Sequence, residues 1–256
     1  MIFFRLGDEY ITRCTAKLCG ELDHYVMRTT AKKEKKKMET NKQINTKTLV
    51  LTAALTAMVV VLQLLGSFIR LGMFSISLVL VPIVIGAAIC GAGAGAWLGL
   101  AFGVTVLLSG DATAFFVVNP VGTILTVLVK GTAAGLCAGL IYKLVSSLCT
   151  KASTDPKPAK WPWLDKVRAW VLKYLPVVCA AVVCPIVNTG IFLIGCNLFF
   201  YDTVAEWGRG LGYDNAVKYM FLGLAGGNFI FELIFNIVLS PVIVRVLSIN
   251  KKIFKF

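Results

Sequence analysis

The chain has 256 residues, of which 57% are hydrophobic and 15% are charged, whereas about a quarter of the residues in a soluble domain are charged. Its formal net charge is +13, but the basic residues lie in tails and loops beside apolar segments, which is typical of membrane proteins and argues against a nucleic-acid partner. The composition therefore indicates an all-α integral membrane protein, because lipid cannot satisfy the exposed edge of a strand.

Residues 1–47 form a basic N-terminal segment ahead of the first apolar run. They hold a run of charges at 32–37 and no apolar core of a signal peptide. We expect either a disordered tail or a translation start at Met27 or Met38.

The apolar segments predict six transmembrane helices, since about 20 apolar residues cross a hydrocarbon core of roughly 30 Å. Residues 74–108 carry no charge and are too many for one crossing. Because glycine breaks helices easily, Gly91 is the predicted hinge between two of the spans. The predicted spans are 48–67, 74–90, 92–108, 119–142, 176–200 and 219–247.

Positive charge predicts the orientation of these spans. Lys and Arg are concentrated in residues 143–174 and in a C-terminal tail, 250–256, and such loops are usually cytoplasmic. Six spans place both segments and the N-terminus on the cytoplasmic side, whereas one span at 74–108 would separate them.

The basic segment between the fourth and fifth spans has a pattern of its own. Residues 151–160 predict a linker, and the stretch after it predicts a cytoplasmic, interfacial amphipathic helix that contacts membrane lipid. A plain polar loop is the alternative. The apolar face of the predicted helix consists of Trp163, Val167, Trp170, Val171 and Tyr174.

Two charged residues fall inside predicted spans. Lys130 lies eleven residues into the fourth span and Glu232 thirteen residues into the sixth, so both are expected at similar depth. A charge within the bilayer is costly unless it is paired or hydrated. The two could pair with each other, contact a substrate, or reach the surface by snorkelling.

Polar side chains converge with these charges. Asn228, Glu232 and Asn236 follow each other at intervals of four and share one helix face. Small polar ligands need such groups between apolar walls, although interhelical hydrogen bonding would explain them too. The predicted substrate-binding residues are Asn119, Thr123, Lys130, Asn188, Asn197, Asn228 and Glu232.

Small residues recur every four positions on three predicted helices, which favours close helix packing. Ala53 and Ala57 form such a face on the first span. The glycines that recur at this spacing along the third and fourth spans are Gly91, Gly95, Gly99, Gly103, Gly131, Gly135 and Gly139.

Motifs for catalysis and metal binding do not occur in the sequence. There is no GxxxxGK[ST], HExxH or GxSxG motif, no CxxC pair and one histidine, His24. We therefore expect no enzyme activity, no metal and no cofactor. We see no inverted repeat of a self-sufficient carrier, so another subunit is expected to supply energy for any transport.

Several stretches resemble the S components of energy-coupling factor (ECF) vitamin transporters, in the branch of folate-, pantothenate- and riboflavin-type members. The resemblance covers about residues 48–247. It rests on LTAALTAM, SLVLVPIVIGAAICGAGAGAWLGLAFG, NPVGTILTVLVKG, NTGIF and NFIFELIFN, in chain order.

This resemblance implies a six-helix bundle in the bacterial cytoplasmic membrane that captures a vitamin or a related small molecule from outside. It implies a T component and two cytoplasmic ATPase subunits as partners, which use the ATP. Ala53 and Ala57 match the family's AxxxA face for the T component. The N-terminal extension and the Trp-rich loop depart from the family pattern.

Two other classes remain open from the sequence. A non-transport membrane scaffold or assembly protein would use the polar residues only to join helices, and an integral membrane enzyme is disfavoured by the missing motifs. Some aromatic residues could stack on a ligand ring or face lipid: Phe115, Phe116, Phe199, Phe200 and Tyr201.

Overall fold

The computed structural model describes residues 46–68, 70–71, 74–75, 78–154 and 162–254. The predicted N-terminal tail, apart from its last two residues, and most of the predicted linker lie outside the described residues. The chain forms two units, Met1–Val50 and Leu51–Phe256, and the core and the cavity described below belong to the second.

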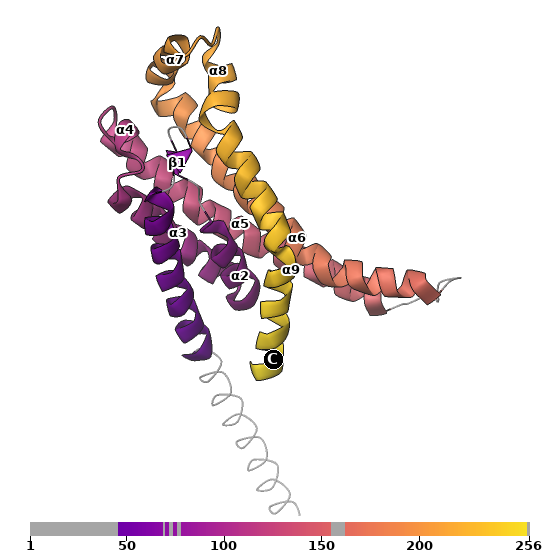
Figure 1. The fold of residues 1–256 in the computed structure, drawn as a ribbon. Coiled ribbons are helices and arrows are strands. Elements are labelled where there is room, and N and C mark those ends of the chain that lie inside the picture. The colour runs from indigo at the N-terminus through magenta and orange to yellow at the C-terminus, as the bar shows by residue number, and fades with distance from the viewer. Residues whose placement is uncertain (1–45, 69, 72–73, 76–77, 155–161, 255–256) are drawn as a thin grey trace, which may run out of the picture. The chain divides into compact units, whose positions relative to one another are not determined.

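Helices make up most of the second unit (Figure 1). The apolar helix Thr46–Phe68 comes first in the described chain. The elements after it are β1 (Arg70–Leu71), β2 (Phe74–Ser75), α2 (Leu80–Cys90), α3 (Ala92–Ser109), α4 (Thr113–Phe116), α5 (Pro120–Thr154), α6 (Pro162–Phe199), α7 (Tyr201–Gly210), α8 (Ala216–Tyr219), the π-helix η1 (Met220–Leu224) and α9 (Gly226–Phe254).

Within the described residues, five helices are long and apolar enough to cross a membrane: Thr46–Phe68, Ala92–Ser109, Pro120–Lys151, Val167–Phe199 and Gly226–Ile249. The chain is therefore a multi-pass membrane protein. The predicted span 74–90 is wrong in extent, because its helix α2 has only 11 residues and reaches about 17 Å. The residues before α2 include β2, which pairs with β1 as a short antiparallel hairpin.

The short helix α2 lies inside the core rather than at its edge. Its residues Leu80, Ile83 and Val84 are fully buried, and it packs against α3, α5, α6 and α9. Neighbouring helices thus cover the faces that a longer span would expose to lipid. The predicted hinge after α2 is confirmed, since Gly91 has φ 92°, a backbone conformation that favours glycine.

The glycine faces of α3 and α5 bring these two helices into backbone contact. A Cβ built on Gly99 would overlap the carbonyl oxygen of Gly131, and one on Gly95 would overlap that of Gly135. A side chain at either position is therefore incompatible with the observed approach. The close packing predicted from the four-residue spacing is confirmed.

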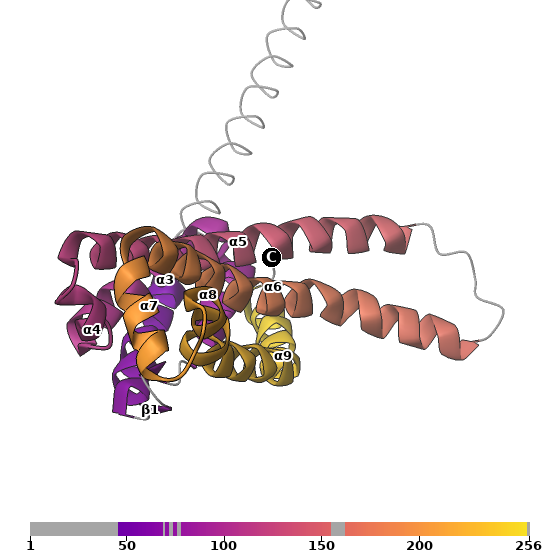
Figure 2. The same cartoon turned by 90° about the horizontal axis from the view of Figure 1, so that it is seen from above.

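The helices α5 and α6 are longer than predicted. With 35 residues, α5 spans about 52 Å, well beyond a hydrocarbon core. Figure 2 shows its C-terminal end beside the N-terminal end of α6, extending past the other helices. We call residues 143–154 and 162–175 the arm.

The amphipathic helix of the arm is not the separate element that was predicted. Its residues belong to α6, which continues through Pro176 into the membrane span. Trp163 and Trp170 are exposed, and Trp170 stacks on Tyr174 with ring centroids 4.6 Å apart. Contact of this face with lipid stays a prediction.

The last span also begins later than predicted. Residues 219–225 contain the end of α8 and the π-helix η1, and α9 starts at Gly226. From there α9 continues to Phe254, into the predicted tail 250–256. It packs mainly against α6 and α2.

Candidate functional site

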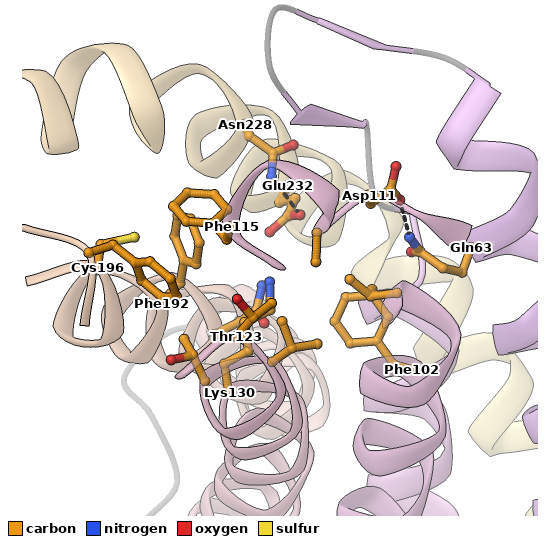
Figure 3. A pocket seen from close by; sticks show the side chains of 16 residues that line it. Gln63, Phe102, Asp111, Phe115, Thr123, Lys130, Phe192, Cys196, Asn228 and Glu232 are labelled. Carbon is orange, nitrogen blue, oxygen red and sulfur yellow. Dashed lines mark hydrogen bonds between the residues drawn. The ribbon is translucent and has the colours of Figure 1, made fainter. Parts of the chain in front are cut away.

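A cavity of about 660 Å³, including the space at its open mouth, lies between the helices of the second unit. Figure 3 shows its side chains pointing toward a common space. The lining residues come from the first helix and α3 (Gln63, Phe102, Val106), from the segment through α4 (Asp111, Ala112, Phe115), from α5 (Thr123, Thr126, Val127, Lys130), from α6 and the residue after it (Asn188, Phe192, Cys196, Phe200) and from α9 (Asn228, Glu232).

Five of the seven predicted site residues line this cavity: Thr123, Lys130, Asn188, Asn228 and Glu232. They come from α5, α6 and α9, so the predicted convergence of three helices is present. Asn119 and Asn197 do not line it. Asn119 precedes α5, and Asn197 is exposed on α6.

The polar stripe of α9 is one continuous hydrogen-bonded row. Asn228 donates to Oε1 of Glu232 at 3.1 Å, Asn236 donates to the Glu232 carbonyl at 2.8 Å, and Ser240 donates to the Asn236 carbonyl at 2.9 Å. Glu232 and Asn236 are each 1% exposed. The stripe therefore faces the protein interior along its length.

The two charges predicted within the spans do not form a direct hydrogen-bonded pair. The second carboxylate oxygen of Glu232, Oε2, has no hydrogen-bond partner in the described chain. The ammonium of Lys130 lies 5.0 Å from the ring centre of Phe192 and 6.0 Å from that of Phe102, which are cation–π distances. The two charges attract each other at longer range.

A second polar contact at the cavity was not predicted. Gln63 is 2% exposed and donates from Nε2 to Oδ2 of Asp111 at 2.7 Å. Ser109 donates to the same oxygen at 3.2 Å. This contact joins the first helix to the turn after α3 at the cavity edge (Figure 3). Gln63 is the only amide side chain in the predicted first span, and that was the signal available.

Aromatic rings form much of the apolar wall. The ring of Phe115 packs edge-on against Phe192 at 5.7 Å and against Phe200 at 5.1 Å between centroids. Phe115 and Phe200 were among the aromatics for which the sequence left open whether they stack on a ligand ring or face lipid. The other three, Phe116, Phe199 and Tyr201, do not line the cavity.

The predicted site residue Asn119 has a structural role in the described chain. Its Oδ1 accepts a hydrogen bond from the backbone N–H of Gly122 at 3.0 Å, which is the geometry of a helix N-cap. We expect Asn119→Ala to cost about 1 kcal/mol of stability and to lower the melting temperature by roughly 2–4 °C, measured by thermal unfolding in detergent.

The matched control is Asn197→Ala, because Asn197 is exposed and its removal should leave the melting temperature unchanged. Ligand affinity should not change in either variant. A tenfold loss of ligand affinity in Asn119→Ala would show that Asn119 binds the ligand, as the sequence predicted.

Comparison with known protein families gives one match. The family model "ECF transporter, substrate-specific component" matches residues 47–244, which includes the five membrane-spanning helices almost entirely. Searches of curated proteins and of solved structures returned no match.

Proposed function

The chain belongs to the family of ECF transporter substrate-specific components, and we propose that it captures a vitamin or a related small molecule in the cavity described above. As a member of that family it is a substrate-binding membrane subunit rather than an enzyme. The observation that carries the proposal is the convergence of Lys130, Asn188 and Glu232, from three helices, on one cavity with aromatic walls.

The direction and the energy source of transport are part of the same proposal. The chain takes its substrate from outside a bacterial cell membrane, with both termini in the cytoplasm and α2 completing a sixth, short crossing. A T component and two ATPase subunits supply the energy. The excess of Lys and Arg in residues 143–174 supports this orientation.

Binding is expected to require this chain alone, because the cavity is formed within one unit. We expect one member of a panel of B vitamins and their precursors to stabilise the purified full chain against heat. A ligand at a hundred times its Kd adds about 2.7 kcal/mol to the stability of the folded state. Mass spectrometry of co-purified small molecules gives an independent identification.

A pair of tryptophan variants tests whether the cavity is the site. Ala112 lines the cavity and is 8% exposed, whereas Ala114, two residues later, is exposed. Ala112→Trp should fill the cavity edge and abolish the ligand-induced thermal shift, and Ala114→Trp should retain it.

Melting of both variants without ligand checks that the fold is intact. If no compound of the panel stabilises the chain and none co-purifies, the proposed function fails. If Ala112→Trp binds as the unchanged chain does, the ligand lies elsewhere.

A further inference from the structure

The cavity contains hydrogen-bond acceptors that nothing in the described chain satisfies. Oε2 of Glu232 and Oδ1 of Asn188 are buried without a partner, and the two residues are only 1% and 5% exposed. Buried polar atoms in folded proteins are nearly always hydrogen-bonded. Because both residues line the same cavity, a bound molecule can supply the missing donors.

The chemistry of these two oxygens defines what the ligand must offer there. An ionised carboxylate and an amide oxygen only accept hydrogen bonds, so the ligand must present N–H or O–H groups. A protonated nitrogen is the best match for Glu232, since hydrogen bonds between ionised groups are stronger than neutral ones. Asn228 already donates to Oε1, and the Asn188 side chain also interacts with this carboxylate. Oε2 has no partner within hydrogen-bond distance in the described chain and is therefore the oxygen left for the ligand.

Lys130 sets a second requirement for the ligand, which concerns its charge. Its ammonium lies against the rings of Phe102 and Phe192, and the carboxylates of Glu232 and Asp111 attract it at longer range. A cation in a poorly solvated site favours an anion beside it. Asp111, the third charged residue of the lining, already accepts hydrogen bonds from Gln63 and Ser109. The charges left for a ligand are those of Lys130 and Glu232, so a ligand with one charge would leave one of them uncompensated, while a ligand carrying both signs would compensate both.

The walls set the third requirement. Phe102, Phe115 and Phe192 surround the space next to Lys130 (Figure 3). Aromatic side chains pack favourably with another ring at centroid distances of about 4.5–7 Å. A planar ring between the two charged ends is therefore the fitting core of the ligand.

We propose that the substrate is a small zwitterionic ring compound. Its basic nitrogen donates to Glu232 and Asn188, its ring lies among Phe102, Phe115 and Phe192, and its acidic group binds Lys130. This inference rests on the proposed function and narrows the substrate to one chemical class.

Three matched probes test the class: para-(aminomethyl)benzoate, which has both charges, para-toluate, which lacks the amine, and benzylamine, which lacks the acid. Their affinities for the purified full chain are measured by titration calorimetry at up to millimolar concentration. We expect the zwitterion to bind roughly 10- to 100-fold more tightly than either single-charge probe, as one charge-assisted hydrogen bond implies.

Two variants assign each end of the probe. Glu232→Gln should remove the advantage of the zwitterion over para-toluate. Lys130→Met should remove its advantage over benzylamine. Asn197→Ala is the control, because Asn197 is exposed and outside the cavity lining. If Glu232 or Lys130 acted only in folding, its substitution would leave the ratio of the zwitterion's affinity to that of the single-charge probe unchanged.

Equal binding of the zwitterion and a single-charge probe would overturn the substrate class, as would failure of all three probes to bind. The proposed function fails separately, on the vitamin panel. A neutral panel compound that binds in the cavity would thus sustain the function and refute the zwitterion.

Discussion

Replacing Gly99 by alanine is expected to destabilise the chain by roughly 1–3 kcal/mol, and replacement by leucine is expected to prevent folding into a stable bundle. The reason is the contact between α3 and α5. The added Cβ would overlap the carbonyl oxygen of Gly131 and come within 2.6 Å of its carbonyl carbon. These are backbone atoms, which cannot rotate away as a side chain would.

Gly93 on the same helix provides the matched control. It is exposed, and a Cβ built there meets nothing within 4 Å. Gly93→Ala should be neutral or stabilise by up to about 1 kcal/mol, because alanine is the better helix former. Thermal unfolding in detergent compares the two.

Equal melting temperatures for Gly93→Ala and Gly99→Ala would show that α3 and α5 do not approach as observed. Equal melting temperatures for Gly93→Leu and Gly99→Leu would show that the glycine face of α3 has no role in packing. Gly135→Ala on α5 is an independent variant of the same contact, since its Cβ would overlap the carbonyl oxygen of Gly95.

The success of the glycine prediction shows what spacing alone can reveal. Four-residue repeats of glycine place small residues on one helix face whatever the neighbouring helix is. The same logic holds for Asn228, Glu232 and Asn236, whose shared face follows from their intervals. Glu232 and Asn236 are buried, and Asn228 is half-buried in the cavity lining. The hinge at Gly91 and the shared helix faces depend on local sequence alone, so they can be predicted from it.

Element lengths were harder to predict because the neighbours decide them. An uncharged run such as 74–108 is equally apolar whether it faces lipid or protein, so it did not reveal that α2 is short and enclosed. The predicted fifth span begins at Pro176, and proline usually starts or breaks a helix. In the structure α6 continues through it while packed along α5.

Some residues of the candidate site could also be predicted from the sequence, and others depend on how the helices pack. Lys130 and Glu232 were found because a charge in an apolar span is unusual. Phe102 and Phe192 were not, because phenylalanine is ordinary in a span and only the fold places these two around Lys130. Asp111 lies between two predicted spans, and its contact with Gln63 joins residues 48 positions apart.

Ala57→Leu is expected to abolish uptake of the substrate while leaving its binding unchanged, and Ala53→Leu is expected to do the same. Both alanines are exposed on the helix Thr46–Phe68 in the described chain, whereas Leu55 and Val59 on another face are buried. Packing within the described bundle therefore does not account for the small side chains. A partner helix that approaches closely would account for them.

The two measurements separate coupling from folding. Substrate binding is measured on the purified chain, and uptake in cells that also produce a T component and ATPase subunits. Ala54→Leu is the matched control, because Ala54 is an exposed alanine of the same helix outside the four-residue pair, and it should retain more uptake than either variant. Loss of substrate binding in Ala57→Leu would show that Ala53 and Ala57 support the structure of the cavity. Full uptake in both Ala53→Leu and Ala57→Leu would show that this helix face does not contact a partner subunit. Uptake lost with binding intact is the outcome expected of a subunit that holds its substrate alone and depends on a partner to release it.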